Sequence, residues 1–206
     1  MTIKGIDISH WNMVKDFTMI KDSGVDFVVI KAGGSDRGFY TDGCFYNYHR
    51  LSQLAGLNVG AYYFVGKDFV GKEAGLSDAK RFYKIIKGLR FEYPVFLDLE
   101  TTHPKDKKQA TDAAIEFCEY LEYRGYFVGI YASDISGFKE RLEIDRLPYA
   151  KWVARYGKKP EYVKDIGIWQ KSSTGAVPGI IGNVDIDTSY VDYEKIIKAK
   201  GFNGWR

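Results

Sequence analysis

The sequence predicts an α/β fold, an irregular TIM-like barrel of five β/α units followed by three strands without crossover helices. Three observations support this prediction. Eight short apolar runs, rich in β-branched and aromatic residues, have the length of buried strands. Helical patterns separate the early runs, and such alternation is typical of a parallel α/β sheet. Towards the C-terminus the apolar runs continue, but the helical patterns stop.

The predicted strands follow one another along the whole chain. In order they are Gly5–Ile8, Phe27–Lys31, Val59–Val65, Pro94–Glu100, Phe127–Ala132, Lys151–Arg155, Ile166–Gln170 and Asn183–Asp187. Helical patterns, with apolar residues three or four apart, cover residues 14–20, 45–54, 82–89 and 110–121. Gly24, Gly56 and Gly125 follow three of these patterns, where glycine typically ends a helix.

The last three strands need a different connection. Neither residues 156–165, which include Gly157 and Pro160, nor residues 171–182 have a helical pattern. Parallel neighbours need a crossover of about a dozen residues or more, usually a helix. We therefore expect loops here and a partly antiparallel arrangement. Because no linker, repeat or low-complexity segment divides the chain, residues 1–206 are predicted to form a single domain.

The composition excludes several classes of protein. Of the 206 residues, 45% are hydrophobic and 28% are charged, as in ordinary globular domains. No window resembles the ~18 uncharged apolar residues of a membrane span, so we expect no membrane partner. The net charge of +3 comes from interspersed signs, without the basic stripe of a protein that binds nucleic acid. Cys44 and Cys118 lack metal-site spacing and are expected to be buried thiols.

Two acids end the fourth predicted strand. Asp98 and Glu100 are separated by one residue, so an extended strand points both side chains to the same side. In a barrel, the C-terminal ends of the strands open onto the catalytic face. Neighbouring carboxyls in an apolar setting raise the pKa of at least one of them, and a protonated acid beside an ionised one suits glycosidic bond cleavage. The structural alternative is a strand that simply runs out into a polar loop.

Acids also end the first and the last predicted strands. Asp7 lies at the end of the first, and Asp185 and Asp187 occupy alternate positions in the last. Because these strands are neighbours in a closed barrel, Asp7 and Asp185 are expected to meet Asp98 and Glu100 around one mouth. Burying unpaired charge is costly, so acids at three strand ends indicate a site rather than a contribution to stability.

Aromatic side chains, 16% of the sequence and more than a core of this size needs, gather near the same strand ends. Rings stack on the apolar faces of sugars, while tyrosine hydroxyls and glutamine amides hydrogen-bond to sugar hydroxyls. The residues expected to bind a sugar are Tyr62, Tyr63, Tyr131, Trp169 and Gln170, with Trp11, Phe64 and Tyr156 near them. For each single ring, core filling is the alternative. Lys31 ends the second strand and is expected either to bind an anionic substrate group or to pair with one of the acids.

Other chemistries have weaker support. The acids could hold Mg²⁺ for phosphoryl transfer, but the sequence has no Gly-rich phosphate loop. No set of His and Cys has zinc spacing, and no Gly-x-Ser-x-Gly motif supports a nucleophilic serine. We therefore expect no metal and no cofactor.

With these residues assembled, the chain resembles the glycoside hydrolase family 25 lysozymes, which are Chalaropsis-type N-acetylmuramidases and include many phage endolysins. The matching segments occur in family order over nearly the whole chain. They are Gly5–Asn12, Phe27–Ala32, Asp42 with Phe45 and Asn47, Gly60–Phe64, Pro94–Glu100, Gly129–Tyr131, Ile168–Gln170 and Gly182–Asp185.

The resemblance implies cleavage of the β-1,4 bond between N-acetylmuramic acid and N-acetylglucosamine. Glu100 would be the general acid, and Asp98 either the nucleophile or the group that orients the N-acetyl oxygen of the substrate. Asp7 and Asp185 match the other two acids of the family's site, and Lys31, Tyr62, Tyr131 and Trp169 match positions that line the groove. Two departures stand out: relatives often carry His where Tyr63 stands and Asn where Asp187 stands. We favour Asp185 over Asp187 as the site residue.

The leading hypothesis is therefore a muramidase that acts on the peptidoglycan glycan strands of bacteria. The alternative is a catalytically inactive barrel that binds cell-wall sugars. We expect a monomer without a separate cell-wall-binding module, so that the groove itself anchors the protein. The N-terminus lacks a charged-then-apolar signal segment. We therefore expect synthesis in the cytoplasm without a classical signal peptide, and action on the wall after release or non-classical export.

Overall fold

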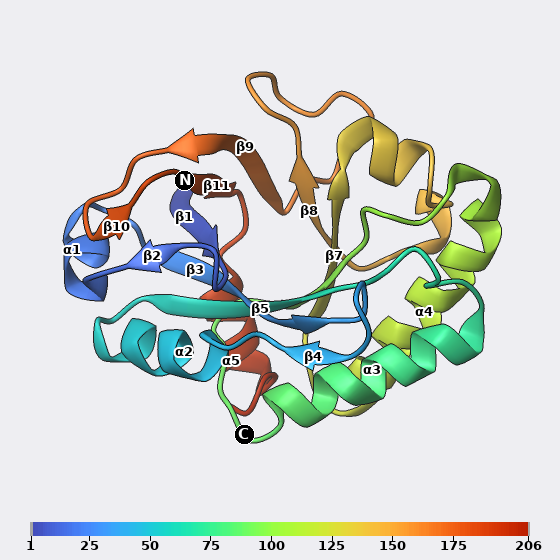
Figure 1. Ribbon diagram of the computed structural model, residues 1–206, viewed down its shortest axis with the longest axis horizontal. Helices are drawn as coiled ribbons and strands as arrows, with labels where there is room; N and C mark the ends of the chain where they lie inside the picture. Colours follow the sequence, from blue (N-terminus) through green and yellow to red (C-terminus); the bar gives the residue numbers. More distant parts are fainter. Residues whose placement is uncertain (1, 206) are drawn as a thin grey trace.

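Eight strands close a barrel (Figure 1). In the computed structural model, which describes residues 2–205, β1 pairs with both β3 and β11, and the order around the barrel is β1-β11-β9-β8-β7-β6-β5-β3. The barrel strands are β1 (Ile3–Ile8), β3 (Phe27–Gly34), β5 (Asn58–Phe64), β6 (Val95–Asp98), β7 (Val128–Ser133), β8 (Ala150–Ala154), β9 (Ile168–Gly175) and β11 (Val184–Ser189). The short β4 (Tyr40–Thr41) pairs with β3, and β2 (Met13–Val14) pairs with β10 (Ile180–Ile181). The predicted fold class is confirmed, and every predicted strand overlaps an observed one.

Four α-helices connect the first strands and pack outside the barrel (Figure 1). They are α1 (Phe17–Asp22), α2 (Phe45–Leu54), α3 (Lys72–Ile86) and α4 (Lys107–Tyr123), the last preceded by the 3₁₀ turn η1 (Pro104–Asp106). The carboxylate of Asp16 accepts the backbone N–H groups of Thr18 and Met19 and so caps α1. The apolar faces of α3 and α4 meet at Phe82 and Phe117, whose rings stack with centroids 5.9 Å apart.

The fifth crossover departs from the prediction of a helix in each unit. Between β7 and β8 the chain forms a π-helical segment, η2 (Asp134–Lys139), and a 3₁₀ turn, η3 (Ile144–Arg146). Gly137 permits the close approach of η2 to β7, because a Cβ at this position would lie 2.6 Å from the Cβ of Ala132. The fifth β/α unit therefore has no α-helix.

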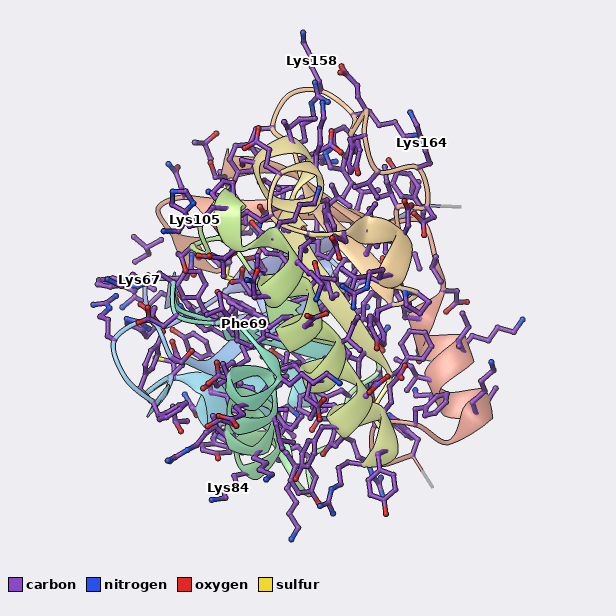
Figure 2. All side chains as sticks on the ribbon, turned by 90° about the vertical axis from the view of Figure 1, so that its right-hand side faces the viewer. Lys67, Phe69, Lys84, Lys105, Lys158 and Lys164 are labelled. Carbon is purple, nitrogen blue, oxygen red and sulfur yellow. The ribbon has the colours of Figure 1, made fainter. Side chains whose placement is uncertain are left out.

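The last three strands are joined by loops, as expected. β8 and β9 pair in parallel, whereas β11 pairs antiparallel with both β9 and β1. Figure 2 shows Lys158 at the tip of the β8–β9 connection, which projects away from the barrel, and Lys164 further along it. An additional helix, α5 (Tyr193–Lys200), follows β11 and is absent from the prediction.

Two apolar clusters hold the fold together. One lies between the barrel and its helices and includes Cys118, which is fully buried, whereas Cys44 is half-buried; both cysteines are free thiols. The other fills the barrel with Phe27, Phe96 and Trp152 among others. Within residues 2–205, no helix combines the length and the apolar character that crossing a membrane requires.

Candidate active site

Polar side chains replace the apolar filling at one end of the barrel. Alternation along the strands places them on the inner face: Asp98 lies two residues beyond Phe96, and Gln170 two residues beyond Ile168. This end is the C-terminal face of the parallel strands. Since β11 runs antiparallel to β1, Asp185 near the start of β11 pairs in register with Asp7 near the end of β1.

The structure brings the four predicted acids together. Asp7 faces Asp185 across two paired strands. The charge of Glu100 raises the pKa of both Asp98 and Asp185, although burial is the larger cause in each case. The charges of Asp7, Asp98 and Asp185 all raise the pKa of one side chain, Tyr62. These four acids therefore share one mouth.

Asp98 and Glu100 form a closely coupled pair. Burial raises the pKa of Asp98 well above its ordinary value, and the neighbouring Glu100 carboxyl raises this pKa further. Glu100 is open to solvent on one side, but the surrounding protein still raises the pKa of this acid. Oδ1 of Asp98 is buried without a donor among the described residues. Burial and the neighbouring carboxyl thus favour a protonated acid at this pair.

Asp7 belongs to a buried hydrogen-bond network. Nε2 of Gln170 donates to Oδ2 of Asp7 at 2.7 Å, and the hydroxyl of Tyr131 donates to Oε1 of Gln170 at 2.8 Å. Burial raises the pKa of Asp7, and the charges of Asp187 and Asp185 raise it further. Gln170 and Tyr131 therefore position one acid of the mouth.

Asp185 and Asp187 have different surroundings. Asp187 is fully buried, and its Oδ1 accepts the indole N–H of Trp152 at 2.8 Å. Asp185 is only half-buried and responds to Glu100; burial and this neighbour raise the pKa of Asp185 to about 6. Of the two, Asp185 is the one that reaches the open mouth.

Lys31 points among aromatic rings. Its Nζ lies 4.4 Å from the ring centroid of Phe64 and 5.9 Å from that of Tyr62. Its charge lowers the pKa of both Asp98 and Glu100, but no carboxylate among residues 2–205 lies within ion-pair distance of it. The structure thus leaves Lys31 as a half-buried cation beside the coupled acids.

A pocket of about 360 Å³ opens beside the coupled acids. Glu100 and Tyr131 line one part of it, and Arg141 and the exposed Tyr156 line another. The hydroxyl of Tyr156 also donates to Oε1 of Gln170 at 3.2 Å, which joins the pocket wall to the buried network.

The chain matches a family model described as Glycosyl hydrolases family 25 over residues 6–180. The chain belongs to this family. It is 30% identical to an autolytic lysozyme of Clostridium acetobutylicum over 186 residues, which is 90% of this chain and 55% of that relative. The chain thus spans little more than half the length of this curated relative.

Solved structures of similar proteins have the same fold. One is the catalytic domain of the endolysin ply40 from bacteriophage P40 of Listeria monocytogenes, with a TM-score of 0.80, 25% identity, and 98% of each chain covered. Another is the modular autolysin LytC of Streptococcus pneumoniae in complex with a synthetic peptidoglycan ligand. Its TM-score is 0.75 at 25% identity, and the match covers 92% of this chain and 47% of LytC. The family expected from the sequence motifs is confirmed.

Two predicted sugar-binding residues of this family 25 chain lie elsewhere. Tyr63 is only 1% exposed, packs on Phe82 and Phe117 outside the barrel, and places its hydroxyl 3.4 Å from Asp78. The expectation that Tyr63 contacts a sugar is wrong, because alternation along β5 turns it away from the mouth that Tyr62 faces.

Trp169 also faces away from the barrel interior. It alternates with Gln170 on β9, and its indole N–H donates to the backbone oxygen of Arg155 at 2.8 Å. The structure does not bring Trp169 to the acids, and its contact supports the turn that follows β8.

Sequence reasoning missed Arg141, which lines the pocket, and Asp134, which pairs with the lining residue Arg155. Arg141 follows η2, far from any strand end, and enters the pocket lining only because of the irregular fifth crossover. Asp134 is buried and accepts hydrogen bonds from the backbone of Glu161, Tyr162 and Val163. An acid directly after a buried strand was the available signal for Asp134, whereas no sequence pattern points to Arg141.

Proposed function

We propose that this chain is a muramidase that cleaves the β-1,4 bond between N-acetylmuramic acid and N-acetylglucosamine in peptidoglycan. The observation that carries this proposal is the coupled pair of Asp98 and Glu100 at the mouth of a family 25 barrel. Two interacting carboxyls that retain one proton can protonate a leaving oxygen and stabilise an oxocarbenium-like transition state.

Glu100 is the proposed general acid. It is the exposed member of the pair and lines the pocket, so its proton can reach the glycosidic oxygen of a bound glycan. Asp98 is fully enclosed behind it and acts as the nucleophile or orients the N-acetyl group of the substrate for attack. Asp185 is half-buried and, when ionised, places negative charge near the positive charge that develops on the sugar, while the buried Asp7 pairs with it in register.

The spacing of the pair supports a retaining reaction. Inverting glycosidases hold their carboxyls ~6.5–9.5 Å apart to admit a water molecule between acid and base. Asp98 and Glu100 are separated by one residue at the end of β6, and each affects the pKa of the other, which favours direct attack by Asp98 or by the substrate N-acetyl oxygen over attack by an intervening water. We therefore expect the product to keep the β-anomeric configuration.

The lining of the mouth supports a glycan as the substrate. Tyr62 and Tyr131 present rings and hydroxyls from the inner face of the barrel, and Tyr156 is 54% exposed at the rim. Trp11, 73% exposed after β1, can provide a further stacking surface. Bacterial peptidoglycan is the proposed partner, and the cell wall the proposed place of action.

Substitution of Glu100 by Gln tests the proposal. The change removes the acidic proton but keeps the shape, so the release of reducing ends from purified bacterial walls should fall about 10²–10⁴-fold. Glu140→Gln, an exposed change beyond η2, is the matched control and should leave the rate unchanged. Analysis of the first-formed anomer in the wild-type reaction tests retention.

Two outcomes would contradict the muramidase proposal. One is full activity of Glu100→Gln. The other is a wild-type protein that binds walls without releasing reducing ends, which would support the inactive sugar-binding barrel instead. Activity that a chelator abolishes would point to metal-dependent chemistry.

A further inference from the structure

The pocket beside Glu100 contains a positive charge, Arg141, which lowers the pKa of Glu100 and has no assigned contact with the substrate. Arg141 contributes its guanidinium to the lining at the C-terminal ends of β7 and β8, where Ser133 and Ser136 place their hydroxyls. The two hydroxyls lie 2.5 Å apart. This part of the pocket is therefore polar and cationic, unlike the aromatic surface around Tyr62.

Two backbone contacts fix the orientation of the guanidinium. Nε of Arg141 donates to the carbonyl oxygen of Thr102 at 2.6 Å, and Nη1 donates to the carbonyl oxygen of Ser136. Thr102 belongs to the loop that follows Glu100, and Ser136 belongs to η2. Neutral carbonyls orient the group but do not neutralise it, and no carboxylate among residues 2–205 is at ion-pair distance from Arg141.

Arg155 lines the same pocket but is neutralised. Its Nη1 lies 2.8 Å from a carboxylate oxygen of Asp134, and its Nη2 lies 2.9 Å from one of Glu161. Glu100 is the acid in the pocket lining, and as general acid it has to be protonated when it acts. Arg141 is thus the cation of this pocket that is left to meet a charge from the ligand.

When backbone carbonyls hold one edge of a guanidinium, its other edge is free to bind a carboxylate. Its remaining N–H groups form a planar fork that can donate to both oxygens of a carboxylate, and such charge-assisted bonds are stronger than neutral ones. N-Acetylmuramic acid differs from N-acetylglucosamine by a lactyl ether, whose carboxyl group is free in peptide-free strands and forms an amide bond where a peptide is attached. The free lactyl carboxyl, or the carboxyl groups of the attached peptide, are ionised at neutral pH.

We propose that Arg141 binds a carboxylate of the muramyl unit, supplied by the lactyl ether or by the attached peptide, and thereby selects peptidoglycan over uncharged N-acetylglucosamine polymers. This inference rests on the proposed muramidase function and names the substrate group that one residue recognises. Ser133 and Ser136 supply hydroxyl donors on the same wall of the pocket.

The test measures each variant of the protein on three forms of the substrate. The forms are glycan strands with peptides, strands with the peptides removed, and peptide-free strands with the muramyl carboxylates reduced to alcohols. The measurement is kcat/KM from reducing-end release by the wild type, Arg141→Met and the control Arg146→Met. Arg146 pairs with Asp112 and Glu143 away from the pocket, so its substitution removes an equal charge.

We expect Arg141→Met to lose about 10–100-fold in kcat/KM on the form that carries the recognised carboxylate, and to approach the wild type once that group is gone. If the loss is present on strands with peptides and disappears once the peptides are removed, the carboxylate belongs to the peptide. If the loss appears on the peptide-free strands, whose lactyl carboxyls are free, and disappears on reduction, the carboxylate is the lactyl group. Arg146→Met should show no such dependence on the substrate.

An equal loss of Arg141→Met on all three forms would overturn the inference, because damage to the fold or to Glu100 does not distinguish the substrates. Wild-type inactivity on all three forms would contradict the muramidase proposal instead. Calorimetric binding of peptide-free strands to Glu100→Gln, with and without Arg141→Met, then tests the carboxylate contact without turnover. Where Arg141→Met fails to fold, Arg141→Lys keeps the charge, lacks the fork and should show a smaller loss with the same substrate dependence.

Discussion

At the scale of single residues, Asp187 and Asp7 form a second coupled pair. Oδ2 of Asp187 is buried without a donor among the described residues. Burial raises the pKa of Asp187 from 3.8 to about 7, while the hydrogen bond from Trp152 lowers it in part. The folded protein therefore keeps a proton on this pair that the unfolded chain loses near its ordinary carboxyl pKa.

The sign of the pH dependence follows from this proton. Between pH 3.8 and about 7 the native state binds more protons at Asp187 than the unfolded state does, so folding becomes less favourable as the pH rises through this window. A neutral amide has the shape of the protonated acid and lacks the ionisation. It can still accept the indole N–H of Trp152 and can donate to Asp7.

We therefore expect Asp187→Asn to raise the free energy of unfolding above that of the wild type in a pH-dependent manner. The gain should be near zero at pH 4 and on the order of 2–4 kcal/mol at pH 8. Urea unfolding at a series of pH values measures it, and Asp22→Asn, an exposed change in α1, is the control. A gain that is the same at every pH would show that the native state does not hold this proton.

At the scale of elements, regular segments were predictable and irregular ones were not. The strands and α1 to α4 show clear apolar periods, and alternation from Phe96 to Asp98 led to the acids at the mouth. The signals for α5 were present in Asp192, which caps the helix, and in Gly201, which ends it with φ of 68°, but eight residues are a short pattern. The π-helical η2 has no sequence period of its own, and residues that it brings to the site, such as Arg141, were missed with it.

Strand alternation also decides which aromatic side chains face the mouth. Tyr62 and Tyr63 are adjacent, so a strand points them to opposite faces, and only Tyr62 can face the mouth. The same holds for Trp169 and Gln170. Composition and family resemblance predict that aromatic rings line the site, but they do not distinguish one ring from another. The strand face on which each ring lies decides which of them line the site.

The β8–β9 connection depends on Asp134. Burial alone would raise the pKa of Asp134, but bonds from the backbone N–H groups of Val163, Glu161 and Tyr162 and from Arg155 outweigh this effect and lower the pKa. Because the folded pKa is lowered, the stability from this contact is present above the unfolded carboxyl pKa and is lost as the pH falls. The tethered connection begins beside Tyr156 at the rim of the pocket.

We expect Asp134→Asn to loosen this connection at neutral pH. An amide nitrogen in place of one carboxylate oxygen faces backbone donors and leaves buried N–H groups unpaired, at a cost of about 2–4 kcal/mol. Amide hydrogen exchange of residues 156–166 should accelerate, and the rate on cell walls should fall through the displaced Tyr156. Asp145→Asn, an exposed change in η3, should alter neither. Unchanged hydrogen exchange in the Asp134→Asn variant would show that the β8–β9 connection is ordered without the carboxylate of Asp134.

At the scale of the whole molecule, the acids of the site and the packing of the C-terminal helix lie at opposite ends of the barrel. The acids occupy the C-terminal end of the parallel strands, and α5 covers the opposite end, near the bottom of the ribbon in Figure 1. Tyr193 and Ile197 of α5 are buried against the apolar filling that contains Phe27 and Tyr93. Asn203 adds polar contacts, with its Oδ1 accepting the N–H of Phe127 at 2.7 Å and its Nδ2 donating to the oxygen of Tyr93 at 2.9 Å.

This division predicts that stability and activity respond separately to a change in α5. Ile197 is fully buried, so Ile197→Ala should leave a cavity and lower the free energy of unfolding by about 2–5 kcal/mol in urea titrations. Its neighbour Ile196 is half-buried, and Ile196→Ala should cost less. At a temperature where both variants remain folded, kcat/KM on cell walls should stay within about twofold of the wild type, because in such barrels the end opposite the active face contributes mainly to stability. A fall in kcat/KM that tracked the loss of stability would instead mean that the packed interior transmits the change along the strands to the acids, and that the two ends of the barrel are not independent.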